Sequence, residues 1–249
     1  MKDVVVGLGE IGKSIFKLIS KSIETVGYDK NIKSMPKSNQ KYAKLPTRFL
    51  HICIPYNKTF DSNIKKLVTK FSPKCIIIHS TVQPKTTSQL QSKFKIPVIY
   101  SATRGVHKRM LYDLRRYTKF FAMEKNAPNA KWASSQFSLL MRKVGVKTKR
   151  MSDPLTLELA KIICDTSYYG WLINYAQISQ MITSKYKVDY DEMWSFANEI
   201  HKFLGNRPKM FPGFIGGHCV IPNLELMDEN SLNQINKINE FFKKFKNKL

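Results

Sequence analysis

The stretch Val4-Val5-Val6-Gly7-Leu8-Gly9-Glu10-Ile11-Gly12 decides the fold of this chain. Its β-branched run predicts a strand, its spaced glycines predict a tight turn, and apolar positions with helical spacing follow from Ile11 to Lys21. Glycines at such a turn let the backbone approach a ligand closely, and the amides at a helix start can bind a pyrophosphate. A strand, a glycine turn and a helix in this order indicate a dinucleotide-binding unit.

A carboxylate stands where such a unit needs one. Asp29 lies 20 residues after Gly9, at the end of the next predicted strand. Its charge would hold a ribose diol and repel a 2′-phosphate, which favours NAD over NADP, although Lys30 beside it weakens that preference. We therefore expect the cofactor to be NAD, held by Gly7, Gly9, Glu10, Ile11, Gly12 and Asp29.

The first 150 residues alternate short β-branched runs with amphipathic stretches. This alternation predicts parallel strands joined by right-handed crossovers, and hence a doubly wound α/β sheet of the Rossmann type. The expected strands are Val4–Gly7, Ile23–Tyr28, Phe49–Ile54, Cys75–His79, Val98–Tyr100 and Lys119–Met123. The expected helices are Ile11–Lys21, Thr59–Phe71, Thr86–Phe94 and Lys131–Lys143, and the lysine-rich segment 30–44 is expected to be a solvated loop.

The pattern changes near Ser152, where Ser152-Asp153-Pro154 has the residues of a helix start. From there to about Lys185 only Gly170 disfavours a helix, so one helix of about 30 residues and about 45 Å is predicted. Shorter helices are expected at Asp189–Leu204 and Ser231–Lys248. The expected domains are a Rossmann domain at 1–151 and an α-helical domain, built on the long helix, at 152–249.

Composition narrows the class of protein. A chain of 249 residues with 43% hydrophobic and 24% charged residues can fold around its own core and is not typical of a disordered protein. Its apolar runs are far shorter than the roughly 20 residues of a membrane span, and no signal-peptide pattern precedes Val4. We expect an intracellular, cytoplasmic protein without a transmembrane segment.

The cysteines and the charge add two expectations. The spacing of Cys53, Cys75, Cys164 and Cys219 indicates neither a disulfide framework nor a metal site. The first three of them are expected to be buried and inert. Subtracting 18 acidic from 42 basic residues gives +24, which attracts phosphates and polyanions but also fits a lysine bias of composition.

Several further motifs become informative together. His51-Ile52-Cys53-Ile54-Pro55 ends the third core strand, Ser80-Thr81-Val82-Gln83-Pro84-Lys85-Thr86-Thr87 follows the fourth, Lys161 lies early in the long helix, and Gly216-Gly217-His218-Cys219 comes near the end. In order and spacing they resemble the UDP-glucose/GDP-mannose dehydrogenase family over residues 1–225. We expect no counterpart of that family's third domain, which helps to hold the nucleotide of the sugar.

The resemblance implies that an alcohol is oxidised to an acid by two hydride transfers to NAD, with a cysteine thiolate holding the aldehyde. It makes Cys219 the nucleophile, and an exposed, activated thiol is what such capture needs. Lys161 matches the family's catalytic lysine, and Thr81 matches a threonine that orients water, although capping of the next helix explains Thr81 almost as well. Pro55 and Thr81 are expected beside the cofactor, and Gly216, Gly217 and His218 beside the substrate.

Three positions depart from the family. Asp165 replaces an asparagine of the oxyanion pocket, and its carboxylate would pair with Lys161 instead. Asn223 replaces an aspartate that helps to activate water. The segment Thr103-Arg104-Gly105-Val106-His107 replaces a Pro-Glu-Phe segment and contains no carboxylate, so His107 is the candidate base. These changes put the hydrolytic half of the reaction in question.

Partners and rival functions remain open at this point. Arg104 and the basic residues after it suit a phosphate-bearing substrate such as a nucleotide sugar, and equally a solvated helix face. The long helix resembles the one through which the family dimerises, so a homodimer is expected. A single-hydride β-hydroxyacid-type dehydrogenase would explain the missing hydrolytic groups. An inactive Rossmann module that binds nucleic acid or another polyanion is the third interpretation, disfavoured because Cys219 and Lys161 occur together.

Overall fold

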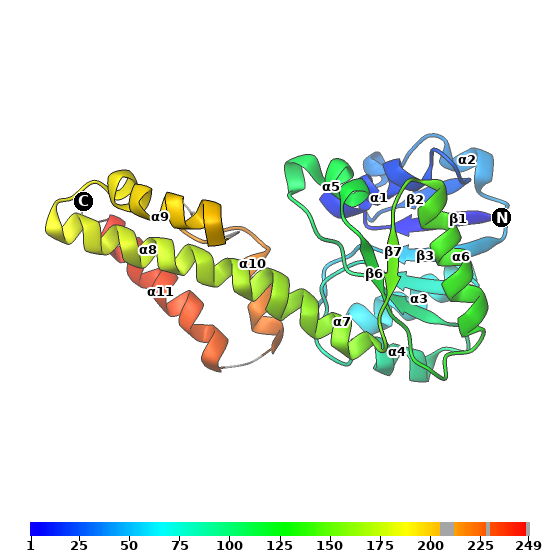
Figure 1. Ribbon diagram of the computed structural model, residues 1–249. Coiled ribbons are helices and arrows are strands. Elements are labelled where there is room, and N and C mark those ends of the chain that lie inside the picture. Colours follow the sequence, from blue (N-terminus) through cyan, green and yellow to red (C-terminus); the bar gives the residue numbers. More distant parts are fainter. Residues whose placement is uncertain (205–211, 228–229, 248–249) are drawn as a thin grey trace. The chain divides into compact units, whose positions relative to one another are not determined.

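The computed structural model describes residues 1–204, 212–227 and 230–247 (Figure 1). It divides into two compact units, Met1–Lys161 and Ile162–Leu249. The division falls inside a continuous helical stretch, so one helix contributes to both units.

The first unit is built on a parallel sheet of five strands in the order β2-β1-β3-β4-β5. The strands are β1 (Lys2–Val6), β2 (Thr25–Tyr28), β3 (Thr47–Ile52), β4 (Cys75–Ile78) and β5 (Val98–Tyr100). Nearly every strand residue is buried, which explains their continuous apolar runs. The chain winds outward from β1 in one direction to β2 and in the other to β3, so the order reverses between β1 and β3. Ligands of open α/β sheets bind at such a reversal, outside the carboxyl ends of the strands.

Helices cover both faces of this sheet (Figure 1). One apolar cluster lies against α1 (Glu10–Ile19), α5 (Met110–Arg116) and α6 (Ala130–Lys143) and contains Ile15, Leu114 and Phe137. The other lies against α3 (Phe60–Phe71), α4 (Thr86–Lys93) and α7 (Pro154–Ala160) and contains Ile64, Leu90 and Leu157. The doubly wound α/β fold predicted from the sequence is confirmed.

The sixth expected strand does not join the main sheet as a parallel neighbour. β6 (Lys119–Phe121) pairs in parallel with β7 (Thr148–Arg150), which was not predicted because its sequence has no apolar alternation. A single antiparallel bridge links the two sheets, in which Tyr100 and Ala122 exchange backbone hydrogen bonds of 2.8 and 2.9 Å.

The second unit is helical. It contains α8 (Tyr168–Tyr186), α9 (Tyr190–Leu204), the short α10 (Val220–Leu224) and α11 (Asn230–Lys246), so the helices expected at Asp189–Leu204 and Ser231–Lys248 are confirmed within a residue or two over the described residues. Its core is formed by Ile162, Ile215, Val220, Leu224 and Ile235. Gly170 of α8 serves this packing, because an added Cβ would lie only 3.2 Å from the side chains of Ile235 and Val220.

The long helix begins as predicted but is not uniform. Asp153 caps it, accepting a hydrogen bond of 2.8 Å from the Thr156 amide, and Pro154 occupies its first turn. After α7 the residues Lys161–Ser167 form a π-helix before α8 continues. The predicted helix of about 30 residues is therefore confirmed as one helical stretch from Pro154 to Tyr186, but the expectation of α-helical geometry throughout was wrong. Such widened turns arise where one extra residue is inserted, and they are frequent at functional sites.

Two smaller expectations were also wrong. The segment 30–44 is not only loop, because it contains a 3₁₀ turn at Ile32–Ser34 and a short helix, α2 (Asn39–Tyr42), whose first residue exchanges hydrogen bonds with the backbone of Gly27. Cys164 is exposed rather than buried, because it lies on the outer side of the π-helix. Within the described ranges, no helix has both the length and the apolar character that a bilayer crossing requires.

Glu158 tests how α7 is fixed to the sheet. This buried carboxylate accepts hydrogen bonds from the Lys85 amide (2.6 Å), the Thr87 amide (2.8 Å) and the Thr87 hydroxyl (2.6 Å) at the start of α4. Glu158→Ala should lower the free energy of unfolding by about 2 to 4 kcal/mol in urea titrations, because it removes all three bonds.

Glu158→Gln, which keeps one acceptor oxygen, should lose less. Asp61→Ala is the control, since Asp61 forms only a surface ion pair with Lys93 and should change stability by less than about 1 kcal/mol. Equal losses for Glu158→Ala and Asp61→Ala would contradict this account of the cap.

Candidate functional site

The glycine turn after β1 is shaped by close backbone contacts. Gly7 has a φ of +84°, and an added Cβ would lie 2.7 Å from the carbonyl oxygen of Cys53, at the end of β3. An added Cβ at Gly12 would lie 1.7 Å from the carbonyl oxygen of Gly7. At Gly9 it would meet nothing within 4 Å, so the outer side of the turn is open. Two glycines therefore fit the turn to the sheet, and the third leaves backbone accessible.

The start of α1 supplies amide donors at this open side. Gly9 is its N-cap residue, its carbonyl accepts from Lys13, and no side chain of the cap residue bonds the first turn. Glu10 is exposed and Ile11 is half-buried, as the first residues of α1. The backbone amides of this turn and the helix dipole together suit an anion.

Asp29 holds the same turn from the side of β2. One carboxylate oxygen accepts a hydrogen bond of 2.6 Å from the Leu8 amide, and the other accepts one of 2.9 Å from the Asn31 amide. Each oxygen keeps a further lone pair, so the carboxylate can still accept from a ribose hydroxyl. The residue that the sequence identified as a ribose ligand is thus also part of the glycine turn.

The loops after β3 and β4 are joined to each other. The Ser80 hydroxyl donates to the carbonyl of Ile54 at 2.5 Å, and the Tyr56 hydroxyl donates to Gln83 at 2.9 Å. Pro55 is exposed and Thr81 is half-buried in these loops. Because Glu158 caps α4, the alternative role of Thr81 as the cap of that helix is wrong.

Lys161 follows α7 directly and begins the π-helix. It is half-buried, as is Asp165 four residues later. Since a π-helix bonds residue i to residue i+5, the relation of these two side chains differs from that of the α-helical pair assumed from the sequence. The bonds of Glu158 fix α7, which Lys161 follows, to the start of α4.

The loop after β5 is held by a carboxylate that sequence analysis missed. Asp113 of α5 is fully buried and accepts from the Val106 amide (2.9 Å) and from Arg109 (3.1 Å). The Val106 amide bond, although opposed by burial, holds the pKa of Asp113 below its ordinary value. In the sequence, Gly105 was the residue that could have drawn attention to this contact. Its φ of +144° and its close approach to Asp113 exclude a residue with a side chain.

The predicted ligands of this loop are only partly described. Arg104 is exposed, donates to the carbonyl of Thr118 at 2.9 Å and lies over the rings of Tyr117 and Phe120. His107 begins a 3₁₀ turn, and its side chain lies outside the described part of the structure.

A buried lysine beneath this loop was also missed. Lys119 of β6 is 5% exposed and donates to the carbonyls of Ser101 and Ala102 and to the Thr103 hydroxyl. Burial lowers its pKa to about 7, and burial raises the pKa of the neighbouring Cys53 thiol to about 12. No sequence pattern distinguished Lys119, because a basic residue at the start of a short strand is usually solvated.

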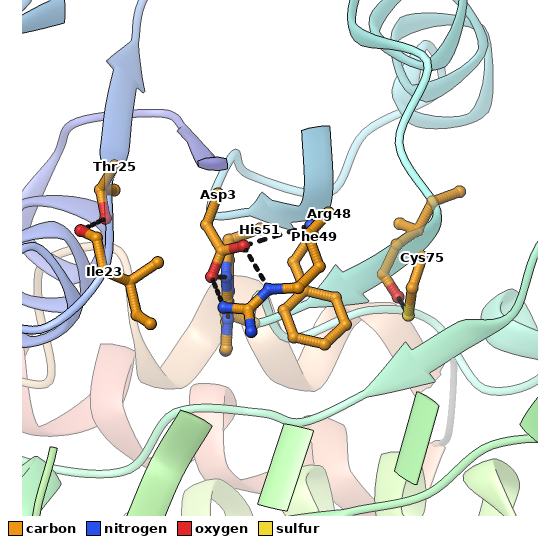
Figure 2. Close-up of polar contacts among 9 residues, drawn as sticks. Asp3, Ile23, Thr25, Arg48, Phe49, His51 and Cys75 are labelled. Carbon is orange, nitrogen blue, oxygen red and sulfur yellow. Dashed lines mark hydrogen bonds and ion pairs between the residues drawn. The ribbon is translucent and has the colours of Figure 1, made fainter. Parts of the chain in front are cut away.

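A polar chain continues inward from Ser101 across the sheet. Its carbonyl lies 3.1 Å from Nδ1 of His79, and Nε2 of His79 lies 2.9 Å from Nδ1 of His51, with the two rings stacked. His51 Nε2 faces Asp3 at 3.6 Å, and Asp3 forms two hydrogen bonds with Arg48, as Figure 2 shows. Although burial alone would raise it, the nearby His51 ring and the two hydrogen bonds from Arg48 hold the pKa of Asp3 below its ordinary value.

The segment that carries Cys219 lies in the second unit. Gly213 is exposed, Ile215 is buried, Gly216, Gly217 and His218 are exposed, and Cys219 is half-buried at the start of α10, in which Asn223 is half-buried. Gly217 has a φ of +75°, which a residue with a side chain rarely adopts.

Three buried amides fix this segment, and sequence analysis did not single them out. Gln177 donates to the carbonyl of Gly213 at 2.7 Å, and Asn239 both accepts from and donates to the backbone of Ile215, at 2.7 and 3.1 Å. Asn174 joins the group by donating to Gln177 at 2.8 Å. The turn before Cys219 is thus held by side chains from α8 and α11.

Known proteins resemble this chain in structure rather than in sequence. No protein-family model matches the chain, and no curated protein matches its sequence. Among solved structures, UDP-D-ManNAc dehydrogenase from Pyrococcus horikoshii matches with a TM-score of 0.78 and 18% identity, over 98% of this chain and 69% of that chain. The chain has the fold of nucleotide-sugar dehydrogenases. The resemblance inferred from its motifs is confirmed at the level of fold.

Two further matches broaden the comparison. The UDP-N-acetyl-mannosamine dehydrogenase of Staphylococcus aureus has a TM-score of 0.70 and 19% identity, with the same coverages. The 3-hydroxyisobutyrate dehydrogenase of Mycobacterium tuberculosis has a TM-score of 0.67 and 12% identity, over 98% of this chain and 93% of that chain. The architecture is thus shared by dehydrogenases of two kinds.

The residues at the glycine turn fit a dinucleotide. The open side at Gly9, the backbone amides at the start of α1 and the lone pairs of Asp29 provide the contacts that a pyrophosphate and a ribose need. Among the residues that the structure describes, no group of three His, Cys, Asp or Glu side chains is placed to hold a metal ion.

The glycine turn offers a matched pair of substitutions. Gly12→Ala should lower the free energy of unfolding by about 3 kcal/mol, because its methyl group would overlap the carbonyl of Gly7. Gly9→Ala, which meets no atom, should change it by less than about 1 kcal/mol. Urea titrations of both variants measure the difference, and equal effects would contradict the described turn.

Lys119 makes stability depend on pH in a defined direction. Because its folded pKa of about 7 lies below the ordinary 10.5, the unfolded chain binds more protons between these values and stability rises with pH across that window. The free energy of unfolding of the wild type minus that of Lys119→Met should therefore rise by about 1 kcal/mol per pH unit between about pH 7.5 and 9.5.

Urea titrations at several pH values measure this difference. Lys149→Met, at an exposed position of the neighbouring strand, should give a constant difference from the wild type. A constant difference for Lys119→Met as well would show that Lys119 is not buried as described.

Proposed function

We propose that this chain is an NAD-dependent dehydrogenase that oxidises a primary alcohol of a sugar-type substrate. The observation that carries the proposal is the glycine turn, where Gly7 and Gly12 are fitted against Cys53 while Gly9 stays open and Asp29 keeps lone pairs for a ribose. NAD bound there would accept a hydride from the substrate carbon.

The proposed cofactor contacts come from this chain's own groups. The amides of Gly9, Glu10 and Ile11 bind the pyrophosphate, and Asp29 accepts from the ribose and disfavours a 2′-phosphate. Pro55 and Thr81 border the cofactor from the loops after β3 and β4, which Ser80 holds together.

Cys219 is the proposed nucleophile. After the alcohol carbon loses a hydride to NAD and its hydroxyl loses a proton, the thiolate adds to the aldehyde carbon and, with a proton, gives a thiohemiacetal. Loss of that proton and of a second hydride to a second NAD would give a thioester. Water would then release the acid and return the thiol. The rigid turn before Cys219, fixed by Gln177 and Asn239, supports this role because it presents Gly216, Gly217 and His218 to solvent.

Lys161 is proposed to stabilise the oxyanion that forms at the substrate carbon. Its place at the start of a π-helix supports the role, since such turns re-aim side chains at functional sites. The Asp165 carboxylate is proposed to offset part of the positive charge of Lys161. Arg104 is proposed to bind a substrate phosphate. His107 and Asn223 are the proposed polar groups for water, and the loss of carboxylates there makes thioester hydrolysis the weakest step.

The partner of this chain is proposed to be a second copy. Large aromatic side chains are exposed on α8, among them Tyr168 (57%), Tyr169 (51%), Tyr175 (62%) and Tyr186 (68%). Aromatic residues of this size are enriched at protein interfaces. A small-molecule substrate and a homodimer are therefore proposed together.

A single-hydride dehydrogenase of the β-hydroxyacid type is the second candidate. It is favoured by the match to 3-hydroxyisobutyrate dehydrogenase, which this chain covers to 93% of its length. It also fits the replacements at Asp165 and Asn223, because no thioester has to be hydrolysed. In this case Lys161 acts alone on the alcohol and Cys219 has no covalent role.

The stoichiometry of NADH formation separates the two candidates. The purified chain is incubated with NAD and a panel of nucleotide sugars and 3-hydroxy acids, and NADH is followed by absorbance. We expect a nucleotide sugar to give NADH and a mass increase on Cys219, and Cys219→Ser to stop the reaction at the aldehyde level.

Cys164→Ser, at an exposed cysteine of the π-helix, is the matched control and should retain activity. One NADH per 3-hydroxy acid, unaffected by Cys219→Ser, would select the second candidate. No NADH with any substrate would overturn both.

A further inference from the structure

The ammonium of Lys119 makes all of its hydrogen bonds to the loop that follows β5. Nζ lies 2.8 Å from the carbonyl oxygen of Ser101, 3.1 Å from that of Ala102 and 3.1 Å from the Thr103 hydroxyl. A lysine ammonium has three hydrogens, so these three acceptors account for all of them. Lys119 therefore has no hydrogen left for a ligand, and its action is on the loop that leaves β5.

That loop lies at the carboxyl end of β5, the edge at which such sheets bind ligands. Its next residue, Arg104, is exposed and is the proposed phosphate ligand. The Thr103 amide donates to the carbonyl of His79 at 3.2 Å, and Thr103 itself is 4% exposed. Because Arg104 follows Thr103 directly in the chain, the contacts that hold Thr103 also hold the backbone of Arg104.

The Ser101 carbonyl, which accepts from Lys119, is also held by His79. The Ser101 carbonyl can only accept, so His79 donates from Nδ1. Burial lowers the pKa of His79 well below its ordinary value, which leaves Nε2 of the neutral ring as an acceptor for His51 Nδ1. The other nitrogen of His51 then faces Asp3, which is paired with Arg48.

The direction in which these groups donate excludes proton transfer along the chain. At the Ser101 carbonyl two donors, His79 and Lys119, meet one acceptor, and a carbonyl passes no proton between them. The chain from Arg48 to Lys119 is instead a rigid polar support. It fixes the Ser101 carbonyl from within the sheet while Lys119 holds the two residues that follow.

We propose that Lys119 is a positioning residue of the candidate site, which holds Ser101–Thr103 so that Arg104 is presented to a phosphate-bearing substrate. This role rests on the proposed function, since it gives the loop a substrate to meet. The Asp3, His51 and His79 side chains support Lys119 through Ser101 and are not themselves catalytic.

Protonation changes what Lys119 can hold. The titratable groups that act on it are the Cys53 thiol after β3, Arg104 on the loop and Lys161 at the end of α7, with neutral His79 after β4. A neutral amine has two hydrogens, so all three contacts persist only if the Thr103 hydroxyl turns to donate to Nζ. The charged form leaves that hydroxyl hydrogen for another acceptor, and the site is therefore expected to work in the charged form.

Hydrogen exchange of the loop tests the support without any substrate. In the full-length chain, Lys119→Met should speed the exchange of peptides covering residues 101–106 by about tenfold relative to α6. Lys119→Arg, which keeps charge and donors, and Lys149→Met, at an exposed lysine of β7, should leave it within about threefold. Unchanged exchange in Lys119→Met would overturn the proposal.

A second comparison applies if Lys119→Met does not fold. After correction for intrinsic exchange, protection of the Thr103 amide should change in the wild type between about pH 6 and pH 8.5, as Lys119 loses its proton, but stay constant in Lys119→Arg, whose side chain keeps its charge. The same pH response in both proteins would overturn the proposal.

Kinetics with a nucleotide sugar that the wild type turns over test the link to the site. Lys119→Met should raise KM for the sugar about tenfold and change KM for NAD less than about threefold. In the wild type, kcat/KM should fall above about pH 7, where Lys119 loses its proton. Lys119→Arg should bind the sugar as the wild type does and should not show this fall. Thr103→Val, which removes only the hydroxyl, should also abolish that fall.

The two failures are distinguishable. If the wild type turns over no sugar, the proposed function is wrong and the exchange measurements still decide the support of the loop. If sugars are turned over but Lys119→Met affects both KM values equally, the positioning role is wrong and the proposed function stands.

Discussion

The first unit depends on the contact between the turn that leaves β1 and the end of β3. Gly7 can pass the carbonyl of Cys53 only because it has no Cβ, and Gly12 can start α1 against Gly7 for the same reason. This contact sets where α1 begins, and hence where the amides of its first turn point. It also lies at the reversal of strand order, so the geometry that closes the fold also shapes the sheet edge at which such folds bind ligands.

Much of this was predictable from local sequence. Strand, turn and helix around Gly7–Gly12 fixed the fold class, and Asp153-Pro154 fixed the start of the long helix, because both patterns are local in the chain. The π-helix at Lys161–Ser167 was not predictable, because an inserted residue leaves no mark in apolar periodicity. β7 was missed for a related reason: its residues lie at an exposed edge and show no alternation of apolar and polar side chains.

The site divides in the same way. Glycines and Asp29 could be identified because their roles follow from short motifs, whereas Lys119, Asp113 and the amides of α8 and α11 act across long separations in the chain. Each unit has a buried polar network that fixes the loop next to its predicted functional residue: Lys119 with the His51–His79 pair in the first, Gln177 with Asn239 in the second. Buried groups of this kind are costly unless fully paired, which ties the loops to one conformation.

The central claim is that the glycine turn binds NAD with Asp29 at the ribose. Titration of the full-length chain with NADH and with NADPH, followed by nucleotide fluorescence, tests it most directly. The account predicts saturable binding of NADH, NADPH binding at least about tenfold weaker, and a smaller gap for Asp29→Asn, whose side chain no longer repels a 2′-phosphate. Failure of NADH to bind, or equal binding of the two nucleotides by the wild type, would contradict it.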